Sequence, residues 1–123
     1  ALNDRGKSLK GSKVLILGIA YKKDIDDPRE SPAFEIIELL LKLGAEVTYH
    51  DPHIPVAPRM RTWPHLPPMQ SQPLTSDTLR QADAVLIVTD HTAVDYRQIE
   101  EHAQLIVDAR GVYRGSSTKA VQA

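Results

Sequence analysis

The stretch Val14-Leu15-Ile16-Leu17-Gly18-Ile19-Ala20 decides the fold class of this 123-residue chain. It is a short, continuous apolar run between polar segments, which favours a strand buried on both faces over a helix. Strands of this kind belong to parallel sheets whose two faces are covered by helices. The run therefore predicts an α/β protein.

The segment that follows the polar loop 21–31 is predicted to be a helix. Apolar residues at 33, 36, 37, 40 and 43 recur at helical spacing. Ser31 is a favourable capping residue, and Pro32 is tolerated in a first turn. Gly44 is typical of the left-handed residue just past a helix end.

The rest of the chain continues the alternation of strands and helices. The sequence predicts strands over 46–50, 84–89 and 105–108 and helices over 76–82 and 95–102, with a short strand near 71–74 left open inside the proline-rich stretch 52–73. Asp95 and Gln98 are spaced for a capping box. This order predicts a three-layer, Rossmann-like parallel sheet with helices on both faces. We expect residues 1–12 to be a lead-in, 13–113 the domain and 114–123 a flexible tail.

Composition excludes several classes of function. Fifteen basic residues nearly balance sixteen acidic ones, so neither a nucleic-acid surface nor a membrane surface is expected. The chain contains no cysteine, which excludes a thiolate metal site and a cysteine nucleophile within it. No metal site is expected from the five scattered histidines. Without a long apolar stretch or an initiator Met, the sequence predicts an excised, soluble, cytoplasmic domain.

Ligands of open parallel sheets bind outside the carboxyl ends of the strands, which directs attention to the loops 18–31, 51–53, 89–94 and 108–113. The first loop contains a single glycine, Gly18, so it lacks the G-x-G-x-x-G turn of a full dinucleotide site. It offers cationic side chains instead. Lys22 can reach a phosphate, and Arg29 precedes a helix N-terminus that favours an anion. By spacing alone, their alternation with acidic residues is more typical of solvated loop charges.

Four other residues near these loops are candidates for the site. Arg110 can point a guanidinium into the crevice with Asp108 orienting it, or the two can form a surface pair, and spacing does not separate these alternatives. His91 is suited to acid–base work or to bracing its loop. Tyr21 can stack on a ligand or serve packing.

Taken together, four segments resemble the UDP-binding C-terminal domain of the UDP-glucose/GDP-mannose dehydrogenase family. They are Val14–Pro32 with its Tyr-Lys-Lys-Asp and Asp-Pro-Arg-Glu-Ser motifs, Gly44–Pro52, Ala84–His91 with its Thr-Asp-His motif followed by Val94–Tyr96, and Val107–Arg110. The resemblance runs from about Lys13 to Val112. The residues of these motifs are most similar to those of the UDP-N-acetylhexosamine (UDP-N-acetylglucosamine) 6-dehydrogenase branch.

The resemblance implies a function shared between domains. Such enzymes oxidise the C6 alcohol of a nucleotide sugar to a carboxylate with two NAD+ and a cysteine thioester. The resemblance also implies that Tyr21, Lys22 and Arg110 bind the UDP-sugar and that Arg29 reaches NAD held mainly by an N-terminal domain outside this chain. A central helical segment would carry the cysteine and build a homo-oligomer. This chain would then be an inactive fragment of an oxidoreductase. A non-catalytic binding module with the same fold, and less favourably a receiver-like signalling domain, stay open as alternatives.

Overall fold

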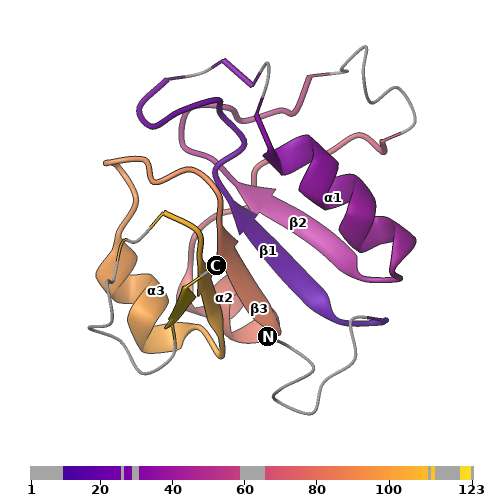
Figure 1. Ribbon diagram of the computed structural model, residues 1–123. Coiled ribbons are helices and arrows are strands. Elements are labelled where there is room, and N and C mark those ends of the chain that lie inside the picture. The colour runs from indigo at the N-terminus through magenta and orange to yellow at the C-terminus, as the bar shows by residue number, and fades with distance from the viewer. Residues whose placement is uncertain are drawn as a thin grey trace.

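The computed structural model describes residues 10–25, 27–28, 31–58, 66–110, 112 and 120–122. Its elements are β1 (Lys13–Leu17), α1 (Ala33–Lys42), β2 (Glu46–His50), α2 (Ser76–Gln81), β3 (Ala84–Ile87), α3 (Tyr96–His102), β4 (Ile106–Asp108) and β5 (Ala120–Gln122). The strands form one sheet in the order β2-β1-β3-β4-β5, and every neighbouring pair is parallel (Figure 1). The predicted fold class is confirmed.

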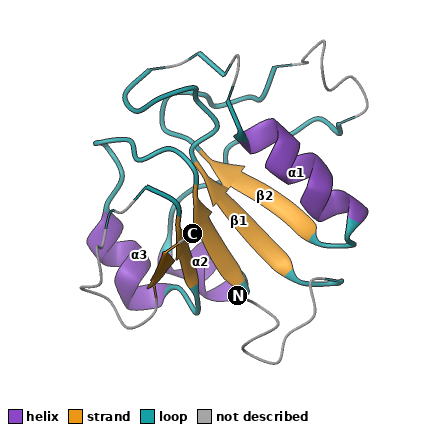
Figure 2. Ribbon diagram, viewed as in Figure 1, coloured by secondary structure: helices purple, strands orange, loops and turns teal. Residues whose placement is uncertain are grey.

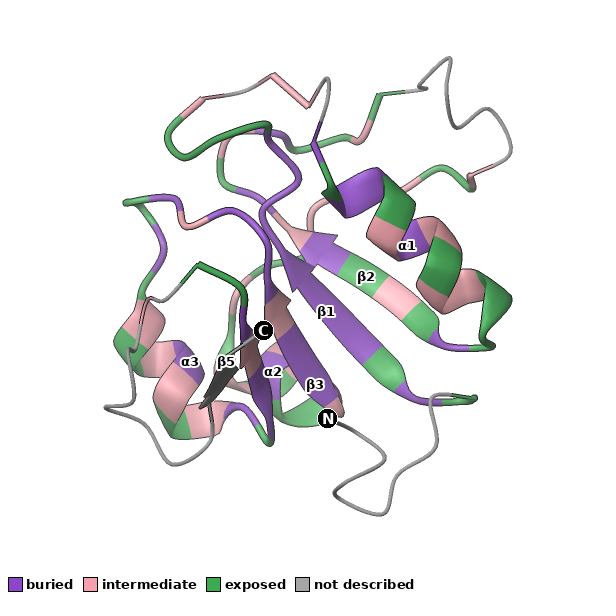
Figure 3. Ribbon diagram, in the orientation of Figure 1, coloured by how far each residue is buried: buried purple, intermediate pink, exposed green. Residues whose placement is uncertain are grey.

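Helices cover both faces of the sheet, as Figure 2 shows. Because side chains alternate along a strand, β1 sends Val14 and Ile16 into the cluster packed by α1. Leu15 and Leu17 join the opposite cluster, which α2 and α3 pack. Figure 3 shows the central strands buried and α1 exposed along its outer side. β1 is therefore the centre of a three-layer core.

The order of the strands creates a switch point between β1 and β3. The connection that leaves β1 passes through α1 to β2 on one side, whereas the connection that leaves β3 passes through α3 to β4 on the other. The loops after β1 and β3 therefore diverge over opposite faces and leave a crevice at the carboxyl edge. None of the helices among the described residues has the length and apolar character needed to cross a bilayer.

The boundaries of several elements differ from those predicted. β1 ends at Leu17 because Gly18 adopts φ +83°, although Ile19 and Ala20 remain buried. β3 likewise stops at Ile87. In place of a strand near 71–74, Ser71 makes one isolated bridge with Tyr49. The tail was predicted to be flexible, but its residues 120–122 form β5, a parallel edge strand held by β4.

The helix ends follow the predicted chemistry with two adjustments. Gly44 has φ +89° just past α1, as expected of a helix end. Ser31 Oγ accepts a hydrogen bond from Ala33 N (3.1 Å), but the residue that directly precedes α1 is Pro32. Asp95 caps α3 by accepting from two backbone N–H groups. The reciprocal capping box is found instead at Thr75 and Thr78 of α2.

The buried Tyr49 makes the stability of the fold depend on pH in the alkaline range. Its ring is fully buried and its hydroxyl donates to the Ile54 carbonyl at 2.9 Å. Burial, with the nearby Asp51 carboxylate, raises the pKa of Tyr49 to about 12 from 10.0. Because the folded state holds the proton more tightly, this stability is complete below pH 10 and is lost as the pH rises towards 12.

We therefore expect the free energy of unfolding to fall by roughly 2–3 kcal/mol over that window through this group. Tyr49→Phe removes this pH-dependent part of the free energy of unfolding. At neutral pH the lost hydrogen bond lowers the free energy of unfolding by about 1 kcal/mol. Urea titrations at a series of pH values measure both effects. The matched control is Tyr21→Phe, which removes the same hydroxyl from a side chain that is 52% exposed. An alkaline profile that is the same in Tyr49→Phe as in the parent chain contradicts the assignment.

Candidate functional site

A cationic groove lies at the carboxyl edge of the sheet. Its lining residues are Lys22, Lys23, Asp90, Ala109 and Arg110, and its volume is about 450 Å³. These residues come from the loops after β1, β3 and β4, so the groove lies beside the switch point. The structure thus brings together Lys22 and Arg110, two candidates separated by 88 positions in the chain. Three cations and one carboxylate make the groove suited to an anion.

Arg110 is oriented by a different acid from the one predicted. Asp108 is buried, and its Oδ1 accepts from the backbone N–H groups of Arg110 (3.2 Å) and Val112 (3.0 Å). It therefore shapes the turn. The guanidinium pairs with Asp90, whose Oδ1 lies 3.4 Å from Arg110 Nε. This contact uses Nε, so it leaves the two terminal nitrogens to form a fork towards a ligand.

Two other predicted site residues, Tyr21 and Arg29, are not among the described residues that line the groove. Tyr21 is 52% exposed and does not line the groove, although its neighbour Lys22 does. Its backbone N–H donates to the Asp27 carbonyl (2.7 Å), which closes the loop on itself. Arg29 lies outside the described residues. Their assigned roles stay predictions.

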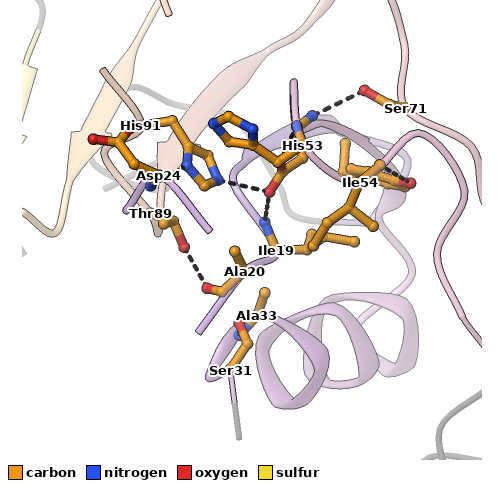
Figure 4. A network of polar contacts seen from close by, with 12 residues as sticks. Ile19, Ala20, Asp24, Ser31, Ala33, His53, Ile54, Ser71, Thr89 and His91 are labelled. Atoms are coloured by element: carbon orange, nitrogen blue, oxygen red, sulfur yellow. Dashed lines mark hydrogen bonds and ion pairs between the residues drawn. The ribbon is translucent and has the colours of Figure 1, made fainter. Parts of the chain in front are cut away.

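A buried polar network holds the loops behind the groove. Asp51 follows β2 and is 1% exposed, and His91 follows β3 and is 0% exposed. Asp51 Oδ2 accepts from the backbone N–H of Ile19 and from His91 Nε2, both at 2.9 Å (Figure 4). Asp51 Oδ1 accepts from His53 N at 2.8 Å. One carboxylate thereby joins the loops that follow three strands.

The second nitrogen of His91 completes the network and fixes its tautomer. His91 Nδ1 lies 2.8 Å from the backbone N–H of Asp24, so it must accept and the proton must sit on Nε2, facing Asp51. Asp24 itself has φ +63°. Its carboxylate accepts from Thr92 N (2.7 Å) and Thr92 Oγ1 (2.6 Å), and these bonds lower the pKa of Asp24 below its ordinary value. His91 is thus a brace beneath the loop that carries Lys22 and Lys23.

Asp24, His53 and His91 also bring potential metal ligands within 4.8 Å of one another. A metal would need a free lone pair on each imidazole. His53 Nε2 is buried and, among the described residues, has no hydrogen-bond partner. Both ring nitrogens of His91, however, are already hydrogen-bonded. The cluster is organised as a structural brace and would have to be dismantled to hold an ion.

A second cavity, of about 140 Å³, lies between α1 and the proline-rich segment. Its lining is mainly apolar, with Ile19, Phe34 and Ile37 on one side and Pro67 and Met69 on the other. None of the described residues that line it is charged, so these residues offer no ligand for a phosphate.

The sequence matches a family model over residues 15–115, and the family is described as the UDP-glucose/GDP-mannose dehydrogenase family, UDP binding domain. The chain belongs to this family. It is 30% identical over 114 residues to UDP-glucose 6-dehydrogenase of Rhizobium meliloti, covering 89% of this chain and 25% of the relative. It is 33% identical over 104 residues to UDP-N-acetyl-D-mannosamine dehydrogenase of Escherichia coli K12, covering 83% and 24%.

The fold agrees with this membership. The solved NDP-N-acetyl-D-galactosaminuronic acid dehydrogenase of Methanosarcina mazei Go1 is similar with a TM-score of 0.75 and 27% identity, over 99% of this chain and 26% of that one. The chain spans about a quarter of the length of the curated relatives it matches. It corresponds to the UDP binding domain of the UDP-glucose/GDP-mannose dehydrogenase family and leaves most of each relative unmatched.

The described residues of this UDP binding domain do not fit a complete NAD site. A dinucleotide cradle needs glycines that let the pyrophosphate approach the backbone after the first strand. Gly18 instead lets the end of β1 approach the loop that follows β3, since a Cβ there would lie 2.4 Å from Thr89 Cβ and 2.6 Å from the Thr89 carbonyl oxygen. The Thr89 hydroxyl then donates to the Ala20 carbonyl at 2.8 Å. This space is filled by protein.

Sequence reasoning missed Asp51 and Asp24, which hold the UDP binding domain's loops in place. A signal for Asp51 was present, because it immediately follows β2 and precedes Pro52 at the carboxyl edge. Asp24 carried no such signal, since it is one of several acids in a polar loop. For His91, the bracing interpretation matches the contacts, whereas its full burial leaves no access for acid–base work on a ligand.

Proposed function

We propose that the cationic groove holds the diphosphate of a UDP-sugar, with Lys22 and Arg110 as its principal ligands. The observation that carries this proposal is their shared groove at the switch point of the sheet. Lys22 supplies a compact charge, and the terminal nitrogens of Arg110 supply a planar fork that matches phosphate oxygens. Tyr21, exposed beside Lys22, would contact the uridine or sugar portion.

We further infer that the parent protein is an NAD-dependent nucleotide-sugar 6-dehydrogenase, which converts the sugar C6 alcohol to a carboxylate. This chain has no cysteine, and its described residues form no dinucleotide cradle. The oxidation would therefore take place on N-terminal and central domains outside it, with NAD as hydride acceptor. The chain alone would bind substrate without turning it over. Contact of Arg29 with NAD, a homo-oligomeric parent and a cytoplasmic location remain part of this proposal.

Calorimetry of the chain with UDP and UDP-sugars at low ionic strength tests the groove. Hydrogen bonds to charged groups are worth enough that Lys22→Ala and Arg110→Ala should each weaken binding about 10- to 100-fold. Arg110→Lys keeps the charge but loses the fork, so its loss should be smaller than that of Arg110→Ala. Screening by salt should weaken binding by the parent chain.

Lys42→Ala is the matched control, since Lys42 pairs with Glu38 on the outer side of α1 and its side chain is 69% exposed. It removes the same charge and should leave affinity unchanged. Undetectable binding, or equal affinities for the parent chain, Lys22→Ala and Arg110→Ala, would count decisively against the groove. The sequence of the parent gene distinguishes the enzyme from the alternative, a non-catalytic module. An enzyme requires a dinucleotide fingerprint and a cysteine in the parts of the gene outside this chain.

A further inference from the structure

Among the described residues that line the groove, one side chain is acidic and three are cationic. Asp90 Oδ1 lies 3.4 Å from Arg110 Nε, and both residues line the groove with Lys22 and Lys23. A carboxylate in a phosphate site repels the ligand as well as orienting the arginine, so its presence there needs a reason. We propose that Asp90 is a specificity-determining residue, which makes the groove prefer the diphosphate diester of a nucleotide sugar over a nucleotide that ends in a free phosphate.

The position of Asp90 is rigidly set. Its neighbours in the chain, Thr89 and His91, are 2% and 0% exposed. The Thr89 hydroxyl is bonded to the Ala20 carbonyl, and both nitrogens of His91 are bonded. Asp90 itself keeps 27% of its side chain exposed at the groove. Because the residues on both sides of Asp90 are held in place, its carboxylate stays at the rim of the groove when a ligand binds.

The charges of groove and ligand explain the preference. The three cations and one carboxylate among the described lining residues carry two net positive charges. Each phosphate of a diphosphate diester carries one negative charge, so a UDP-sugar matches that excess. A free terminal phosphate adds about one more charge at neutral pH, because its second ionisation falls near pH 6. That extra charge meets Asp90 without a further cation among the described groove residues.

This inference rests on the proposed function of the groove, and a titration of the chain with UDP-glucose and with UDP tests it. Asp90→Asn keeps the size of the side chain and an oxygen that can accept from Arg110 Nε, but removes the negative charge. Binding of both ligands should tighten, and UDP should gain about threefold more than UDP-glucose, the scale of one partly exposed charge pair. The difference should shrink at high ionic strength.

The matched control is Asp77→Asn, which changes the net charge of the chain by the same amount. Asp77 lies on α2, is 83% exposed at its side chain and does not line the groove. It should alter neither affinity. Equal gains for UDP and UDP-glucose in Asp90→Asn, or no gain for either, overturn the role of Asp90 while leaving the groove intact. Insensitivity of both ligands to Lys22→Ala and Arg110→Ala would instead overturn the groove itself.

Discussion

Replacing Gly18 with alanine should destabilise the chain by about 3–5 kcal/mol, a large part of the stability of a domain this size. Two costs add. Gly18 has φ +83°, a conformation that L side chains rarely adopt. A Cβ there would also lie 2.4–2.9 Å from three atoms of Thr89, two of them backbone, which cannot move aside as a flexible side chain would. Urea denaturation followed by circular dichroism measures the change.

Gly11→Ala separates these two costs. Gly11 has a similar φ of +80°, but a Cβ there would meet nothing within 4 Å. Only the backbone cost of about 1–2 kcal/mol is expected. Equal destabilisation by the two substitutions would show that the contact between Gly18 and Thr89 is unimportant. Because Gly18 begins the loop that carries Lys22 and Lys23 to the groove, any Gly18→Ala protein that still folds should also bind UDP-sugars more weakly than Gly11→Ala.

The sheet was predictable wherever burial leaves a pattern in the sequence. β1 and β3 are apolar on both faces and α1 is amphipathic, so their existence and type follow from periodicity alone. The ends of the strands were not predictable, since the turn at Gly18 depends on the approach of Thr89 from the loop that follows β3. β5 was missed for a similar reason. Its three residues form a strand only by pairing with β4, and no local pattern marks that pairing.

The groove was predictable in outline, and its supporting contacts were not. Parallel strands bring their carboxyl ends to one edge, so charged residues after different strands can be expected to converge, as Lys22 and Arg110 do. Which acid pairs with Arg110 depends on the distance between two loops, and the structure selects Asp90 over the sequence neighbour Asp108. The Asp51–His91 pair joins positions 40 residues apart in the chain and has no local signature.

Asp51→Asn is expected to cost about 2–4 kcal/mol, although the two side chains have nearly the same shape. Both carboxylate oxygens of Asp51 accept hydrogen bonds: Oδ2 from the buried donors Ile19 N and His91 Nε2, and Oδ1 from the partly buried His53 N. An amide NH₂ in either position therefore faces an N–H group. His91 cannot resolve the conflict by moving its proton to Nδ1, because Nδ1–H would then oppose the backbone N–H of Asp24.

Asp95→Asn is the matched control for this substitution. Asp95 caps α3 by accepting from Arg97 N and Gln98 N with Oδ1 alone, so an asparagine can serve the same bonds and only a few tenths of a kcal/mol should be lost. Urea titration of both variants makes the comparison. Equal, small losses would mean that the Asp51 network does not hold the loops. We expect a large loss of stability for Asp51→Asn alone. Where this variant still folds, it should also bind UDP-sugars more weakly, because the network holds the backbone of Asp24 next to the cations of the groove.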